Sequence, residues 1–202
     1  GGSCNVNELT INPHCNGTHT ESIAHICDFS SNSTFISDIG GNEALAPTFA
    51  QLNLPALMPC AVVSITPELA LERNENYSPK FYEHDLIISN SALKKALSNY
   101  NNAQLQTLVI RSLPNNTNKQ QQAYNSENHP AFFSREAILY LNERGVEHLL
   151  VDLPSIDRLH DEGLMTCHHL FWQVDEGSHQ INKNSLVNKT ITEMAFIDNE
   201  IP

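Results

Sequence analysis

Five segments of the chain are apolar, or alternate between apolar and polar residues, over lengths that suit β-strands. In residues 57–65 the sequence LMPCAVVSI is β-branched and apolar on both faces, which is typical of a strand buried within a sheet. The first and last segments alternate more loosely, as half-buried strands do. The pattern predicts strands in residues 4–11, 57–65, 105–111, 146–157 and 186–198.

Two further segments, residues 92–100 and 135–144, have the spacing of apolar residues that an α-helix requires. In the first of them, Ser91 is the candidate N-cap. In the second, Ser134 is the candidate N-cap, and Gly145 stands at the C′ position, where a left-handed backbone favours glycine.

A helix followed closely by a buried strand is typical of α/β proteins. The predicted fold class is therefore α/β: a single domain over residues 1–202, with a mixed, strand-rich sheet and flanking helices. Polar stretches without periodicity, near residues 30–46, 74–82 and 114–130, are predicted to be loop insertions.

The amino-acid composition argues against two classes of binding partner, nucleic acids and membranes. Apolar residues make up 40% of the 202 residues and charged residues only 17%, which argues against a disordered chain. The formal net charge of −12, with no basic run, argues against binding to a phosphate backbone. No segment approaches the roughly 20 consecutive apolar residues of a membrane span. Neither nucleic acid nor a membrane is therefore expected as a partner.

The five cysteines are odd in number and irregularly spaced, which favours free thiols over a disulfide framework. The N-terminal sequence GGSCNVNEL also lacks the charged start and the apolar stretch of a secretory signal. We therefore expect a reduced, cytoplasmic protein.

The histidines are unevenly distributed along the chain. Common catalytic signatures such as G-x-S-x-G, G-x-G-x-x-G and H-E-x-x-H are absent. Seven of the ten histidines instead lie in two short windows, which surface composition alone does not explain. The first window holds His14, His19 and His25, and the second holds His160, His168, His169 and His179.

The first window contains candidate metal ligands. In an extended backbone, Cys15, Gly17, His19 and Glu21 share one face, which brings together a thiol, an imidazole and a carboxylate. These groups are suitable ligands for a divalent ion such as zinc. His14 has the opposite parity and could join them only through a bulge. The alternative interpretation is a polar strand edge with scattered imidazoles.

The same segment resembles the H-x-G-T-H-x-D-x-P-x-H signature of the metal-dependent cyclase/hydrolase family that includes bacterial kynurenine formamidase and isatin hydrolase. Gly17, Thr18 and His19 match it outright, Glu21 stands at the family Asp, and His25 follows at the family's interval. Three later landmarks follow in the family's order, namely VDLPSID, CHHL and ITEMA in residues 151–157, 167–170 and 191–195. The resemblance implies a swivelling β/β/α fold.

The resemblance also implies a centre of two divalent ions, zinc or manganese. His19 would bind the first ion and His168 the second, while Glu21 and Glu193 would bridge the two. His25 would be the catalytic acid/base rather than a ligand.

The sequence departs from the family pattern at two places. One extra residue before Gly17 leaves Cys15 and His14 as alternatives for the first ligand position. The family proline after the acidic residue is also missing, since Ser22 and Ile23 follow Glu21.

The activity implied by the resemblance is hydrolysis of a small amide, formamide or lactam. A water activated by the metal would attack the carbonyl, and His25 would act as general acid/base. The family further implies a homodimer or homotetramer. The alternative is a non-catalytic relative that binds a small molecule at a degenerate metal site.

Several other polar residues in these segments are predicted to have structural or surface roles. Asp152, Ser155 and Asp157 are expected to organise a turn through hydrogen bonds from side chain to backbone, rather than to take part in chemistry. His160 and His179 are expected to lie on the surface.

Overall fold

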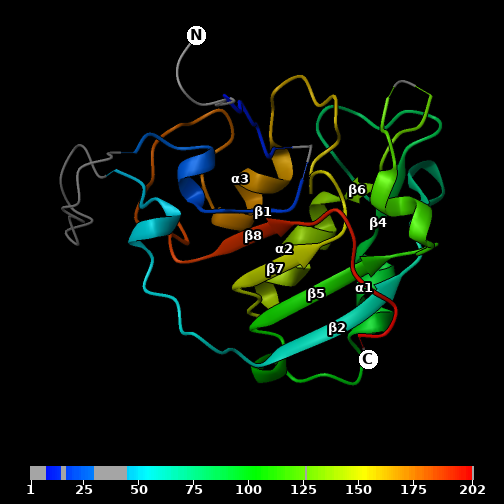
Figure 1. Cartoon of the computed structure of the whole chain (residues 1–202), viewed down its shortest axis with the longest axis horizontal. Coiled ribbons are helices and arrows are strands. Elements are labelled where there is room, and N and C mark those ends of the chain that lie inside the picture. Colours follow the sequence, from blue (N-terminus) through cyan, green and yellow to red (C-terminus); the bar gives the residue numbers. More distant parts are fainter. Residues whose placement is uncertain (1–7, 15–16, 30–44, 126, 202) are drawn as a thin grey trace, which may run out of the picture.

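The computed structural model describes residues 8–14, 17–29, 45–125 and 127–201 (Figure 1). It is a mixed α/β fold with two sheets, which confirms the predicted fold class. The larger sheet has the strand order β1-β8-β7-β5-β2, in which β1 is antiparallel to β8 and the other pairs are parallel. Its strands are β1 (His19–Glu21), β2 (Cys60–Ile65), β5 (Thr107–Ser112), β7 (His148–Val151) and β8 (Thr190–Glu193).

The smaller sheet consists of β3 (Glu68–Leu69), β4 (Leu86–Ile88) and β6 (Phe132–Phe133). Strand β4 lies between the other two, antiparallel to β3 and parallel to β6. Ile87, Ile88 and both phenylalanines of β6 are buried. Burying an apolar side chain of this size contributes about 1.5–3 kcal/mol, so this sheet is a part of the hydrophobic core.

Three α-helices accompany the larger sheet, namely α1 (Asn90–Ala96), α2 (Arg135–Glu143) and α3 (Thr166–Trp172). Helix α2 packs against both α1 and α3, and Figure 1 shows all three behind the strands. Helix α3 is almost wholly buried, and the Trp172 indole Nε1 donates to Lys189 O over 2.9 Å. This burial fixes the position of α3, which is the helix that carries His168.

Four of the five predicted strands are confirmed, with shorter bounds. The strand predicted in residues 57–65 begins at Cys60, because Leu57 lies 92% exposed outside the sheet. The segments near residues 105–111, 146–157 and 186–198 form β5, β7 and β8. The strand predicted in residues 4–11 is wrong for residues 8–11, which are irregular and exposed, while residues 4–7 lie outside the described part.

Both predicted α-helices are confirmed, but one cap differs. In α2 the Ser134 hydroxyl accepts from Ala137 N, and Gly145 has φ +75° after the helix, as predicted. In α1 the N-cap is Ser89, whose hydroxyl accepts from Ala92 N over 3.0 Å. The prediction of Ser91 as the cap is wrong because the helix begins two residues earlier.

The segments predicted to be loop insertions are mostly irregular where they are described. Residues 74–82 contain no helix or strand, whereas residues 114–130 include the 3-10 helix η5 (Thr117–Gln121). Most of the insertion near residues 30–46 lies outside the described residues. Within the described ranges, every helix is too short or too polar to cross a lipid bilayer.

Candidate metal centre

The candidate ligands come from the two strands at one edge of the larger sheet and from the segments beside them. In the antiparallel pair of β1 and β8, His19 lies opposite Glu193, and Glu21 is the last residue of β1. His14 lies in the turn before β1, and His25 ends the 3-10 helix η1 (Ile23–His25) just after it. The hydroxyl of Ser22 caps η1 by accepting from Ala24 N, which fixes how the chain leaves the strand.

Glu21 is the centre of this cluster. Its side chain is 2% exposed, and its Oε1 lies 2.9 Å from His14 Nδ1, 2.9 Å from His19 Nε2 and 3.6 Å from His25 Nε2. Its Oε2 lies 3.2 Å from His168 Nε2. One buried carboxylate therefore faces four imidazoles, as a bridging metal ligand would.

The hydrogen bonds of His19 indicate which of its nitrogens is available. Its Nδ1 lies 2.8 Å from Gly17 O and must donate to that carbonyl, since a carbonyl oxygen only accepts. A neutral His19 then has its lone pair on Nε2, which faces Glu21 Oε1 at 2.9 Å and Glu193 Oε2 at 3.5 Å. Three acceptors that face one another need a cation between them, which is either a proton or a metal ion. The donor set therefore fits a divalent metal.

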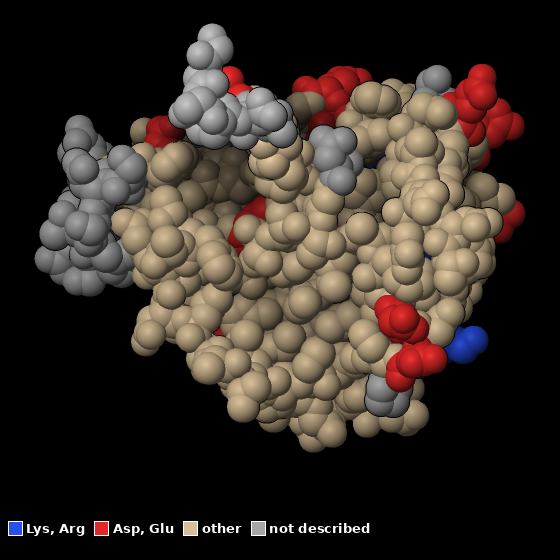
Figure 2. Space-filling model, viewed as in Figure 1, with Lys and Arg blue, Asp and Glu red and all other residues tan. Residues whose placement is uncertain are grey.

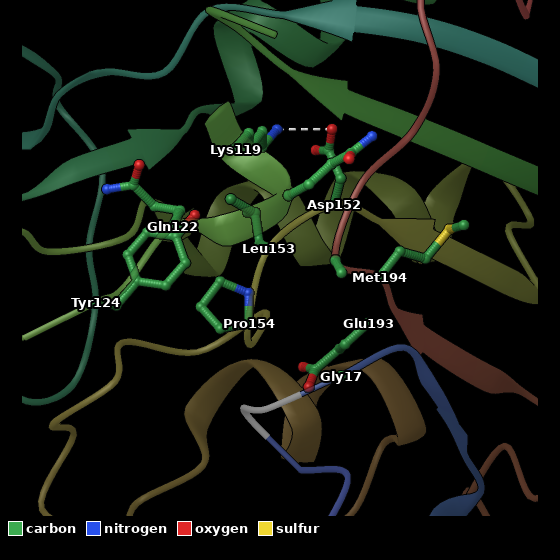
Figure 3. A pocket seen from close by; sticks show the side chains of 11 residues that line it. Gly17, Lys119, Gln122, Tyr124, Asp152, Leu153, Pro154, Glu193 and Met194 are labelled. Carbon is green, nitrogen blue, oxygen red and sulfur yellow. Dashed lines mark ion pairs between the residues drawn. The ribbon is translucent and has the colours of Figure 1, made fainter. Parts of the chain in front are cut away.

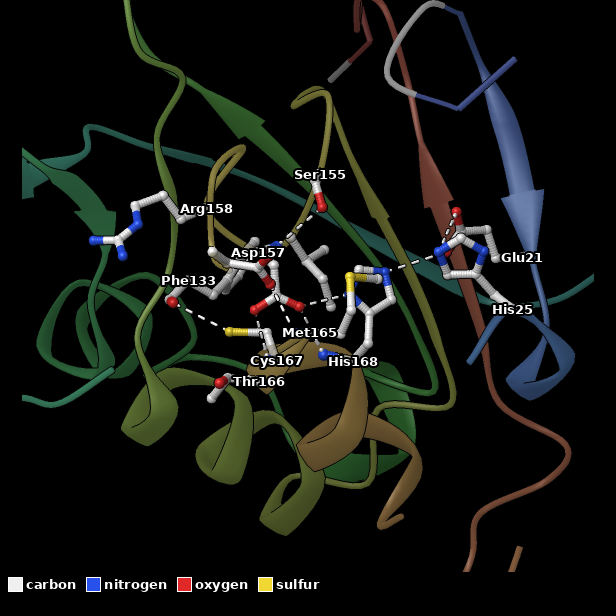
Figure 4. A network of polar contacts seen from close by, with 12 residues as sticks. Glu21, His25, Phe133, Ser155, Asp157, Arg158, Met165, Thr166, Cys167 and His168 are labelled. Carbon is white, nitrogen blue, oxygen red and sulfur yellow. Dashed lines mark hydrogen bonds and ion pairs between the residues drawn. The ribbon is translucent and has the colours of Figure 1, made fainter. Parts of the chain in front are cut away.

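His168 is held in the same way by Asp157 (Figure 4). Its Nδ1 lies 2.6 Å from Asp157 Oδ2, so its Nε2 points to Glu21 Oε2 at 3.2 Å and Glu193 Oε1 at 3.8 Å. Such a pair of carboxylate and histidine fixes the tautomer and the ring orientation of a metal ligand.

Asp157 therefore orients a candidate ligand, and the prediction that it organises a local turn is wrong, while its expected lack of a part in the chemistry stays a prediction. Besides holding the His168 ring, it accepts from Cys167 N and His168 N at the start of α3 and from the Tyr77 hydroxyl. Asp157 precedes α3 and His168 lies within it, 11 residues further along the chain, so their pairing depends on how the chain folds back before α3. The spacing in VDLPSID gave no signal for it.

The predictions for Ser155 and Asp152 have different outcomes. The Ser155 hydroxyl accepts from Asp157 N over 3.1 Å, so its predicted role in a turn is confirmed. Asp152 instead links strand ends, because Oδ1 accepts from Ser112 N over 2.7 Å and Oδ2 lies 2.6 Å from Lys119 Nζ. The predicted role of Asp152 in a local turn is therefore wrong.

The turn before β1 explains how His14 reaches the site. Strand β1 covers only residues 19–21, and Gly17 N donates to Pro13 O over 2.9 Å. Because the chain turns there, the alternation of an extended strand does not extend to residue 14, and no strand bulge is needed. The competing candidate, Cys15, lies outside the described residues.

Opposed charges shift the pKa values of the buried groups. Burial alone would raise the pKa of Glu21, but hydrogen bonding and charge from His168, with further attraction to His25, lower it to about 2. Burial together with the charge of Glu21 raises the pKa of Glu193 to about 7. Burial lowers the pKa of His25 to about 4, although the charge of Glu21 opposes this. The His25 imidazole is thus neutral near pH 7 and can accept a proton.

Two groups of side chains in the described residues bring three ligand atoms within 4.8 Å of one another. One group is His14, Glu21 and His25, and the other is His19, Glu21 and Glu193. The two groups share Glu21, so they outline two adjacent positions for ions. His168 is not a member of either, although it contacts both carboxylates, and His25 lies among the ligand atoms instead. Metal binding by these residues stays a prediction.

A pocket of about 150 Å³ opens onto this cluster. His14, Glu21, His25 and Glu193 line one part of it, and the apolar side chains of Leu159 and Met165 line another. The His25 side chain is 26% exposed, so a bound molecule can reach it. Figure 2 shows acidic atoms in a hollow at the position of β1 and β8. His160 and His179 are exposed and outside the pocket, as predicted.

The fold and the cluster define an α/β protein with a candidate dinuclear centre of histidines and carboxylates. More narrowly, the chain belongs to the Cyclase family, whose model matches residues 3–158. None of the curated proteins matches the sequence.

Solved structures that match this chain have little sequence in common with it. A predicted metal-dependent hydrolase from Bacillus stearothermophilus is 12% identical, with a TM-score of 0.51 over 100% of this chain and 70% of its own. A potential metal-dependent hydrolase with cyclase activity is 11% identical, with a TM-score of 0.45 over 94% and 66%. Isatin hydrolase A from Labrenzia aggregata, bound to benzyl benzoate, is 14% identical, with a TM-score of 0.45 over 94% and 63%.

Proposed function

We propose that the protein is a metal-dependent hydrolase that cleaves the C–N bond of a small amide, formamide or lactam. The observation that carries this proposal is the pair of ligand groups that share the buried Glu21. Membership of the Cyclase family supports it, as does the similarity of the fold to that of a predicted metal-dependent hydrolase.

The donor set suits zinc or manganese, because imidazole nitrogens and carboxylate oxygens are ligands for both. His19, Glu21 and Glu193 would hold one ion, and His14 and Glu21 would hold a second one together with His168. A bound ion supplies Lewis acidity, which lowers the pKa of a coordinated water from 15.7 to about 7.

The protein's own side chains would bind the substrate and move the proton. His25 Nε2 is neutral near pH 7 and lines the pocket, so it can take a proton from the attacking water and return it to the leaving nitrogen. Such general acid/base catalysis contributes about 10²–10⁴-fold. Asp157 orients His168, and the side chains of Leu159 and Met165 provide an apolar wall that excludes water from the substrate.

The setting of this activity is also a proposal. The protein would act in the cytoplasm as a single domain over residues 1–202, assembled as a homodimer or homotetramer, without a nucleic-acid or membrane partner. The excess of acidic residues supports the absence of nucleic acid. Light scattering of the purified protein measures the number of subunits, and a monomer would contradict the assembly.

The test is hydrolysis of N-formylkynurenine and of isatin-type lactams by metal-loaded protein, with and without a chelator. We expect turnover that the chelator abolishes, and about two transition-metal ions per chain by elemental analysis. Glu21→Gln should lose both metal and activity, whereas the exposed Glu143→Gln should keep both. If metal-loaded protein cleaves no small amide, the proposal is wrong, and retention of ligand binding alone would favour the non-catalytic relative.

A further inference from the structure

A second pocket, of about 100 Å³, lies on another side of Glu193 (Figure 3). Its lining residues follow three neighbouring parallel strands, with Lys119 after β5, Leu153 after β7 and Met194 after β8. The carboxyl ends of parallel strands are where open α/β sheets bind ligands. Since Glu193 lines this pocket and also the one that contains His25, the two pockets meet at the candidate metal centre.

The wall formed by η5 is held in place by an internal ion pair. Lys119 Nζ lies 2.6 Å from Asp152 Oδ2 and donates to Ser112 O over 2.9 Å and to Ser112 Oγ over 2.6 Å. The Lys119 and Asp152 side chains are 10% and 0% exposed, so the pair is shielded from water. Because each charge already has its partner, the described residues that line this pocket offer no free cation to an anionic ligand.

Uncharged hydrogen-bonding groups remain available on this wall. Within the described residues, neither the Tyr124 hydroxyl nor the Gln122 side-chain amide makes a hydrogen bond, and both side chains line the pocket. Burial, and the negative charge of Asp152, raise the pKa of Tyr124, so its hydroxyl stays protonated and can donate. Figure 3 shows Tyr124 and Gln122 on one side of the pocket and Met194 on the other.

We propose that this pocket binds an uncharged carbonyl group of the substrate, remote from the bond that is cleaved, with the Tyr124 hydroxyl as the donor. The inference rests on the proposed function, because it assigns a substrate class to the same centre. That class is an elongated amide with a second, neutral carbonyl at its far end. A carboxylate in the same place would find no unpaired cation among the described lining residues, which makes its burial unfavourable.

The experiment measures how metal-loaded protein cleaves sets of three straight-chain amides. The three amides of one set have the same length, and the length increases from one set to the next. The far end of each is a second amide, a methyl group or a carboxylate. We expect the diamide of the matching length to have the lowest KM and the half-acid the highest. Tyr124→Phe should raise the KM of the diamide about 2- to 10-fold, which is the effect of losing one neutral hydrogen bond. The kcat of the diamide and the KM of the methyl-ended amide should not change.

The matched control is Tyr82→Phe, because Tyr82 is exposed and lies outside both pockets. The Tyr124 hydroxyl makes no hydrogen bond to another described residue, so the melting temperature of Tyr124→Phe should equal that of the wild type. Binding is measured separately from turnover by saturation-transfer NMR with a straight-chain diketone, which has two carbonyls and no C–N bond to cleave.

The outcomes separate the two proposals. Loss of diketone binding in Tyr124→Phe, in a protein that cleaves no amide, supports the pocket and contradicts the proposed hydrolase. In the opposite case the protein cleaves amides, but Tyr124→Phe and the wild type bind the diketone equally and have the same KM for the diamide. That result contradicts the proposed role of the pocket and leaves the proposed hydrolase activity intact.

Discussion

The site depends on how single imidazole rings are oriented. His168 donates from Nδ1 to Asp157 and so presents Nε2 to Glu21 and Glu193, while His19 is fixed by Gly17 O in the same manner. Neither ring can rotate without losing its hydrogen bond, which is buried for His168 and partly buried for His19. The geometry of the candidate ligands is therefore set by groups that would not touch a metal ion themselves.

The first prediction concerns Asp157→Asn. An amide can donate to the His168 ring where the carboxylate accepts from it, so the ring no longer presents Nε2 reliably, and metal affinity should fall about 10–100-fold. Titration of zinc against a competing chelator measures the change. Asp198→Asn, on the exposed tail, is the control and should bind as the wild type does. Equal affinity in all three proteins would mean that Asp157 does not orient a ligand.

A second prediction separates the roles of His25 and His168. His168→Ala should lose metal, because its Nε2 faces both carboxylates. His25→Ala should retain the metal content and lose about 10²–10⁴-fold in kcat, as for a general acid/base. The exposed His160→Ala is the control for both. Loss of one metal equivalent in His25→Ala would instead assign His25 as a ligand, as its place beside His14 and Glu21 permits.

At the scale of the elements, helix caps decide where α1 and α2 begin. Ser89 caps α1, and the Glu75 carboxylate accepts from Asn90 N over 2.9 Å and from the Ser134 hydroxyl at the start of α2. One acidic side chain thus connects the beginnings of two helices. Helix α2 in turn packs against α3, which carries His168.

The third prediction compares the two serines at the start of α1. Ser89→Ala removes the acceptor for Ala92 N and should lower the free energy of unfolding by about 0.5–2 kcal/mol. Ser91→Ala removes no cap and should cost less. Urea denaturation followed by circular dichroism measures both. A larger loss for Ser91→Ala would mean that the helix is capped at the position that the sequence suggests.

The fourth prediction concerns the pairing of β7 with β8. His148 is buried opposite Thr190, and its Nδ1 lies 2.9 Å from the Thr190 hydroxyl. Burial lowers the pKa of His148 below 6.5, so the unfolded chain binds a proton before the native protein does. Its contribution to stability is therefore complete well above pH 6.5 and is lost as the pH falls from that value through the lower pKa of the folded protein. The denaturation midpoint should vary less between pH 5 and 8 in His148→Gln than in the wild type. If both proteins show the same pH dependence, His148 is not the group responsible for it.

At the scale of the whole molecule, metal should bind the folded state alone, since the ligands come from distant segments. The fifth prediction is that excess zinc raises the free energy of unfolding by about 2.7 kcal/mol at about 100 times Kd, and raises the melting temperature accordingly. Glu21→Gln should remove this shift, and Glu143→Gln should keep it. A melting temperature that does not respond to any divalent ion would contradict the candidate centre.

The sequence was sufficient for the parts of the fold that local pattern determines. The β-branched run in β2, and the cap and glycine at the ends of α2, are local signals, and each appears in the structure. The pairing of β1 with β8, by contrast, joins residues far apart in the chain. No periodicity encodes such a pairing, because it depends on packing across the whole sheet.

The candidate site was predictable to the extent that a motif described it. His19, Glu21 and His25 lie in one motif, and the structure brings them together with His168 and Glu193. The turn that brings in His14 is local but follows no repeating pattern, and the contact of Asp157 with His168 depends on the position of α3, so no spacing rule reveals either. Tyr124 lies in a polar segment without periodicity, and only the pocket indicates a role for it.

The antiparallel pairing of β1 with β8 has a consequence for synthesis of the protein. A ribosome releases His19 and Glu21 early, but Glu193 emerges only after more than 170 further residues. The nascent chain can present only part of the ligand set during that time, so tight binding must wait until β8 has emerged and joined the sheet. Acquisition of metal would then report that translation has passed residue 193.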